Sequence, residues 1–267
     1  MRARPTAAVF LRQVYLLRGS PARVLPLFAW VAVDIVLWGF ISRYLNTVAA
    51  PGLDFVPALL GAVLLWDFFS RVMQGVTIAF LEDVWARNFL NFFASPLKIS
   101  EYLAGLVIAS TATSAVGLAV MLVLAAAVFG LSAATYGAAL VPLLLVLFLF
   151  GIALGVVGAA VVLRFGPASE WFVWPMPALV APFAGVFYPL STLPGWMRGV
   201  GRALPASYVF EGVRAISAGG AASWSSLAWG ALLACVYVLL ACLLFARVHR
   251  HVVRTGLLAR YSAESVG

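Results

Sequence analysis

Three charged residues lie within long apolar runs of the sequence. A charge in such a run costs free energy to bury, so it usually has a structural or functional role. Asp34 lies in the first run, and Asp67 and Arg71 lie in the second. Asp67 and Arg71 are four residues apart, so on a helix they can form an ion pair. Two interpretations compete: a structural polar contact between helices, or a proton relay of a secondary transporter. A relay usually needs several acids at membrane depth, so two acids favour the structural interpretation.

No residue pattern predicts catalysis, a cofactor site or a metal site in this chain. A phosphate-binding loop ends in a lysine after glycines, yet the single lysine, Lys98, lies between Leu97 and Ile99. The two histidines, His249 and His251, are two residues apart and do not share a helical face. We therefore expect no enzyme, and any ATP and Mg that drive the protein are expected on another chain.

The composition is far more apolar than that of a water-soluble protein. It is 64% hydrophobic and only 10% charged, with a mean hydropathy of +1.07, whereas globular proteins are about 45–50% apolar and about 25% charged. The formal net charge is +8, but the basic residues lie between apolar runs, as topology signals do. The sequence therefore predicts a membrane protein that contacts lipid and binds no nucleic acid.

The apolar runs are long enough to cross a bilayer as helices, which takes about 20 residues each. Turn-forming sequences such as Ala50-Pro51-Gly52 and Gly166-Pro167 separate them. We predict an all-α integral membrane protein with six transmembrane helices. The predicted spans are Val24–Arg43, Val56–Phe80, Tyr102–Phe129, Gly137–Leu163, Phe172–Leu190 and Trp224–Phe245.

The distribution of Lys and Arg orients these spans, because both are enriched in cytoplasmic loops. With the N-terminus inside, thirteen of the 17 basic residues fall on the inner side. Both termini are thus expected in the cytoplasm of a bacterium, with the spans in its inner membrane. We expect one transmembrane domain over residues 1–267, made of a cytoplasmic or interfacial segment (1–23), a six-helix membrane domain (24–247) and a basic cytoplasmic tail (248–267).

Two segments on the cytoplasmic side are predicted to be amphipathic helices. Thr6–Arg18 has an apolar stripe that would suit a helix at the membrane interface. In Leu81–Glu101, aromatic residues recur at spacings of three and four, and Ser95-Pro96 ends the helical pattern. Its acids, Glu82 and Asp83, are expected at the cytoplasmic surface, where charge reversal would leave membrane insertion intact.

Prolines interrupt the apolar stretch Trp171–Gly220, and each one breaks or kinks a helix. We therefore predict a kinked fifth span, followed by short helices that dip back into the membrane from its outer face. In the fourth run, Gly151, Gly155 and Gly158 predict close packing against a neighbouring helix.

The order of these segments resembles the permeases of type-2 ATP-binding-cassette exporters over nearly the whole chain. The most specific parts are the inner sequence LEDVWARNFLNFFASPLKISEYL and the outer sequence FYPLSTLPGW with LPASYVFEGVR. The resemblance implies six helices per subunit, a dimer that forms one pathway, and a separate cytoplasmic ATPase on each half.

The resemblance also implies roles for two groups of residues. Those that match the inner, ATPase-coupling segment are Glu82, Asp83, Trp85, Arg87 and Asn88. Those that match the outer re-entrant segment are Phe187, Tyr188, Pro189, Pro194, Trp196, Pro205, Tyr208, Glu211 and Arg214. The outer aromatic residues fit a gate or an interfacial belt equally well.

The expected function is that of a permease subunit in an ATP-driven exporter. Its partners would be an ATP-binding-cassette ATPase and a second copy of itself, and its substrate a glycan, a glycolipid or another amphipathic molecule. The alternative is a proton-coupled secondary transporter of a hydrophobic small molecule, which would depend on Asp34 and Asp67.

Overall fold

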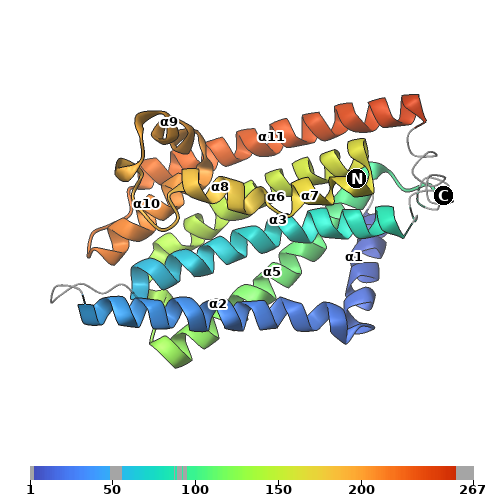
Figure 1. The fold of residues 1–267 in the computed structure, drawn as a ribbon. Coiled ribbons are helices and arrows are strands. Elements are labelled where there is room, and N and C mark those ends of the chain that lie inside the picture. The colour runs from blue at the N-terminus through green and yellow to red at the C-terminus, as the bar shows by residue number, and fades with distance from the viewer. Residues whose placement is uncertain (1–2, 49–55, 87, 89–91, 93–94, 257–267) are drawn as a thin grey trace.

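The computed structural model describes residues 3–48, 56–86, 88, 92 and 95–256, and every regular element among them is helical (Figure 1). The long helices are α2 (Pro21–Val48), α3 (Gly61–Trp85), α5 (Ile99–Phe129), α6 (Leu140–Phe165) and α11 (Trp224–Thr255). The shorter ones are α1 (Ala3–Arg18), α7 (Glu170–Val173), α8 (Met176–Ala184), α9 (Gly195–Ala203) and α10 (Pro205–Ser217). Short helical turns are η1 (Val56–Leu60), η2 (Ala133–Ala139), η3 (Pro167–Ser169) and η4 (Leu190–Thr192).

Five helical stretches in the described part of the chain are long and apolar enough to cross a membrane. They are Pro21–Val48, Val56–Trp85, Ile99–Phe129, Ala133–Phe165 and Trp224–Thr255. These stretches contain the predicted first, second, third, fourth and sixth spans nearly in full, so the all-helical, multi-pass membrane fold is confirmed.

The predicted fifth span, Phe172–Leu190, is broken rather than kinked. Helix α7 ends at Val173, and α8 starts after Pro175, whose ring cannot donate a backbone hydrogen bond. Helix α8 ends at Ala184, and the next residue, Gly185, adopts a left-handed conformation with φ of 63°. Figure 1 shows α7 and α8 following one another along α6, but neither is long enough to cross a membrane alone.

The core is built on α6, which packs against both α3 and α11. The predicted small-residue contact is confirmed: a Cβ atom added to Gly155 would lie 2.8 Å from the carbonyl oxygen of Met73. The Thr77 hydroxyl on α3 donates a 3.1 Å hydrogen bond to the Gly155 carbonyl. Helices α3 and α6 therefore approach each other closely enough for side-chain-to-backbone hydrogen bonds.

The two ends of the helix bundle differ in construction (Figure 1). At one end, α1 lies across the long helices, and α11 finishes at this same end on the opposite side of the bundle. At the opposite end, α9 and α10 form a compact cap between α8 and α11. Each end carries one of the two segments that the sequence singles out.

Candidate functional site

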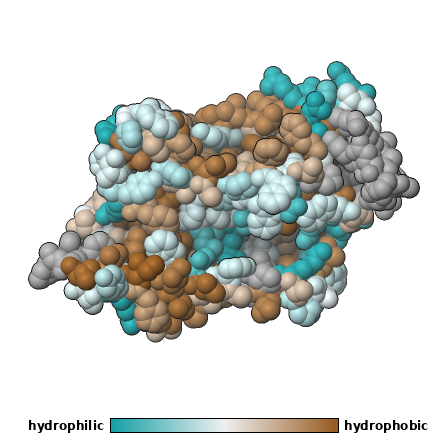
Figure 2. Space-filling model, in the orientation of Figure 1, coloured by the Kyte–Doolittle hydropathy of each residue, from teal (hydrophilic) through white to brown (hydrophobic). Residues whose placement is uncertain are grey.

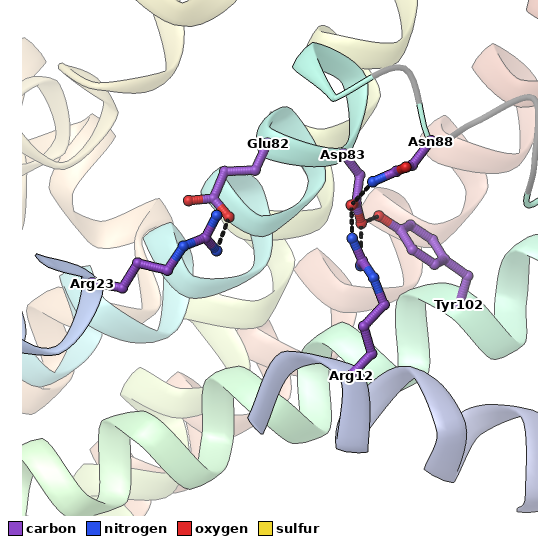
Figure 3. A network of polar contacts seen from close by, with 6 residues as sticks. All are labelled: Arg12, Arg23, Glu82, Asp83, Asn88 and Tyr102. Carbon is purple, nitrogen blue, oxygen red and sulfur yellow. Dashed lines mark hydrogen bonds and ion pairs between the residues drawn. The ribbon is translucent and has the colours of Figure 1, made fainter. Parts of the chain in front are cut away.

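Asp83 is the centre of a polar network at the α1 end of the bundle (Figure 3). Its carboxylate accepts hydrogen bonds from both terminal nitrogens of Arg12, one of them at 2.9 Å. It also accepts one from the Tyr102 hydroxyl at 2.6 Å and one from the Asn88 side-chain amide at 3.3 Å. The network thus joins α1, the last turn of α3, the residues after α3 and the first turn of α5.

Burial makes the pairing of Asp83 and Arg12 strong. Asp83 is only 2% exposed, and a buried carboxylate is tolerated when it is paired and hydrogen-bonded. Burial lowers the pKa of Arg12, but the hydrogen bond to Asp83 and its charge raise that pKa by more, so Arg12 stays charged. The guanidinium also stacks over the Phe92 ring at 5.2 Å from its centre.

A second ion pair lies one residue earlier on α3. Arg23, in the first turn of α2, donates a 2.7 Å hydrogen bond to Glu82. Both side chains are about one third exposed, at 38% and 33%, so this pair contributes less than the buried one. Together the two pairs connect the last turn of α3 to both α1 and α2 (Figure 3).

The structure corrects the prediction for the acids of this segment. Asp83 was expected at the surface, but it points into the bundle because Arg12 and Tyr102 lie there to receive it. Trp85 is 49% exposed at the end of α3. Arg87 and most of the predicted aromatic helix that follows lie outside the described residues.

Sequence reasoning did not identify Arg12, Arg23 or Tyr102 as members of this site. They are 71, 59 and 19 residues from their acidic partners, so no local spacing relates them. One signal was available, because an arginine within the predicted interfacial helix would lie close to acids on the same membrane side.

The opposite end carries a second network, centred on Glu211 and Arg214 of α10. The Glu211 carboxylate accepts hydrogen bonds from the Leu190 backbone amide at 2.8 Å and from Arg214 at 3.0 Å. Arg214 also donates a 2.7 Å hydrogen bond to the carbonyl of Gly185, at the end of α8. The two residues therefore anchor the segment after α8 to α10.

The other residues predicted for the outer segment lie around this anchor. The Tyr188 hydroxyl donates to the Pro182 carbonyl, and the Tyr208 hydroxyl to the Arg202 carbonyl. The Phe187 ring stacks on Trp38 of α2, with ring centres 4.8 Å apart. Trp196 is 67% exposed. The structure thus joins the segment that follows α8 to α10 through Glu211, and it leaves Trp196 largely on the surface.

A cavity of about 370 Å³ lies beside Glu211 and Tyr208, between α10 and the start of α11. Arg202 lines the cavity together with Ser207 and Ser226. Within the described residues, no group of three or more His, Cys, Asp or Glu side chains is arranged to hold a metal ion.

The ion pair predicted within the membrane-spanning helices is present in the structure. The Arg71 Nε atom donates a 2.5 Å hydrogen bond to Asp67, which confirms the predicted pairing. Asp34 has no hydrogen-bond or ion-pair partner among the described residues, although it interacts electrostatically with both Asp67 and Arg71.

These features define an all-helical, multi-pass membrane protein with a polar network at each end of the bundle and charged residues within its spanning helices. The chain matches the family model described as ABC-2 type transporter over residues 14–217. It therefore belongs to the ABC-2 type transporter family, whose membrane domains are translocation components of ABC systems. A search of curated protein sequences found no match for it.

Proposed function

We propose that this chain is the permease subunit of an ATP-driven exporter. Two copies form the translocation pathway in a bacterial inner membrane, and each copy binds a cytoplasmic ATP-binding-cassette ATPase. Family membership and the five membrane-spanning stretches support this proposal. ATP and Mg belong to the partner, because phosphoryl transfer needs a phosphate-binding loop that this sequence lacks.

The proposed topology has six crossings, with α7 and α8 together making the fifth. Broken helices at membrane depth are tolerated where they contact protein or line a cavity, and α7 packs on α6. Six crossings place both termini on the same side, and the basic residues make that side cytoplasmic: twelve of the 17 lie on it, while Arg71 lies within a span. The end with α1 is then the inner end, and α9 and α10 are the outer re-entrant helices.

The observation that carries the proposal is the connection of the end of α3 to three other helices. A displacement of the residues after α3 would pass through Asp83 to α1 and α5, and through Glu82 to α2. An exposed aromatic residue such as Trp85 suits docking into a groove of the ATPase. Such a connection lets ATP-driven closure of the partner change the packing of the membrane helices.

The proposed substrate is a glycan, a glycolipid or another amphipathic molecule. The stacked Trp38 and Phe187 rings form an aromatic surface between α2 and the segment after α8. Aromatic surfaces of this kind stack on sugar rings and also accommodate apolar chains.

Replacing Trp85 tests the coupling role. We expect Trp85→Ala to reach the membrane normally and to lose ATPase co-purification, or to keep the ATPase while transport is uncoupled from hydrolysis. Trp229→Ala is the matched control, because Trp229 is 60% exposed on α11, far along the chain from the network. Normal assembly and normal transport by Trp85→Ala would rule out docking through this residue.

A further inference from the structure

The charges within the membrane-spanning helices lie at one depth. Asp34 is in the middle of the 28-residue helix α2. Asp67 and Arg71 are in the middle of the 30-residue stretch Val56–Trp85. Charges at this depth face a bundle interior or a water-filled cavity rather than lipid.

The three charges do not balance. Asp67 is neutralised by Arg71, with which it shares a 2.5 Å hydrogen bond. Asp34 interacts electrostatically with both of them and has no ion-pair partner of its own among the described residues. Two carboxylates therefore lie beside a single guanidinium.

The charged group is accessible from one face of the subunit. The side chains of Asp67 and Arg71 are 17% and 13% exposed, and Asp34 is also partly exposed. Figure 2 shows a hydrophilic area over the middle of α3, with apolar areas on either side of it. Because this area lies at membrane depth, it must face water, a second subunit or a polar ligand.

A buried hydroxyl without a partner lies at the same level. Ser114 of α5 is 2% exposed, and its hydroxyl makes no hydrogen bond to any residue that the structure describes. One turn away on either side, Ser110 bonds to the Val72 carbonyl, and Gly117 lies against Arg71. Buried polar groups are almost always hydrogen-bonded, so this hydroxyl is an unused polar group beside Arg71.

An aromatic side chain lies on the same face of α2 as Asp34. Trp38 is four residues after Asp34, so both lie on the same face of α2. Trp38 stacks on Phe187, a residue that is 40% exposed. A carboxylate beside an aromatic surface is the combination that recognises an organic cation, through charge pairing and cation–π contact.

We propose that Asp34, with Asp67, Arg71 and Trp38, forms a recognition site for a cationic amphipathic substrate within the translocation pathway. This proposal rests on the proposed function and specifies its substrate class. The cationic group of the substrate pairs with Asp34, while Arg71 holds Asp67. The apolar part of the substrate contacts Trp38 and Phe187.

Direct binding to the purified permease tests the site without the ATPase. The probe is radiolabelled tetraphenylphosphonium, a lipophilic cation, added to the permease in nanodiscs of uncharged phosphatidylcholine. We expect saturable binding that weakens at least about tenfold in Asp34→Asn, since a close charge pair is lost. Asp34→Glu should retain binding, because it keeps the charge.

The control is Glu170→Gln, which removes an acid on α7 whose carboxylate accepts a hydrogen bond from Trp174. Its affinity for the probe should equal that of the wild type. Equal affinity of Asp34→Asn and the wild type would overturn the proposal, as would a lack of saturable binding by the wild type. ATPase co-purification is measured on the same variants, so failure of the site is distinguished from failure of the permease role.

Discussion

At the scale of single residues, the pairing of a charge depends on how far its partner lies along the chain. The pair of Asp67 and Arg71 is predictable, because a spacing of four places both on one side of a helix. The burial of Asp83 is not predictable in this way, because Arg12 comes from another helix. Local sequence identifies Asp83 only as an acid after an apolar run.

The environment of Asp83 predicts a loss of stability on charge reversal. In Asp83→Lys, Arg12 would lose its partner and face a second buried cation, and breaking a buried pair costs about 3–5 kcal/mol. We expect a clearly lower melting temperature of the detergent-solubilised protein. Glu82→Lys is the control, since its exposed pair with Arg23 contributes only about 0–1 kcal/mol. Equal melting temperatures of the two variants would contradict the buried network.

At the scale of helices, the lengths of the apolar runs predict most of the long helices. Where each helix ends depends on prolines in the backbone and on the partners that its polar side chains find. The second span continues past Phe80 to Trp85, because Glu82 and Asp83 find partners and need not leave the helix. The fifth span is divided where Trp174 is followed by Pro175. The sequence shows that prolines are present, but the break depends on how α7 and α8 pack against their neighbours.

The close contact of α3 and α6 predicts that Gly155 cannot be enlarged without cost. In Gly155→Ala the new Cβ would lie 2.8 Å from the Met73 carbonyl oxygen, which belongs to the backbone and cannot easily move. Overpacking of this kind costs about 1–3 kcal/mol, so the melting temperature should fall.

Gly199→Ala is the control for this prediction. It also lies within a helix, α9, but no atom lies within 4 Å of the position of its added Cβ. Alanine favours helix over glycine by about 1 kcal/mol, so this variant should be as stable as the wild type or slightly more stable. A stable Gly155→Ala protein would argue against direct contact of the two helices.

At the scale of the whole molecule, the topology can be tested with reporter fusions. With six crossings and a cytoplasmic N-terminus, fusions after Ser132 and near Gly220 should report an outer location. Fusions after Ser95 and at the C-terminus should report an inner one. If α7 and α8 do not cross, the fusions near Gly220 and at the C-terminus will exchange sides.

The number of subunits is a second prediction at this scale. One bundle of this size presents a single wall of a pathway, so we expect two copies of this chain with two ATPase chains. Mass measurement of the purified complex in detergent or nanodiscs checks this stoichiometry. An active particle that contains one permease chain would contradict the dimer.

The two ion pairs at the end of α3 also fix the rotation of that helix about its own axis. Glu82 and Asp83 are adjacent, so their side chains point about 100° apart around the helix axis. Each is held by an arginine from a different helix, Arg23 on α2 and Arg12 on α1. Turning α3 about its own axis would draw at least one carboxylate away from its arginine. Helix α3 can therefore tilt or slide together with α1 and α2, but it can turn only by breaking an ion pair.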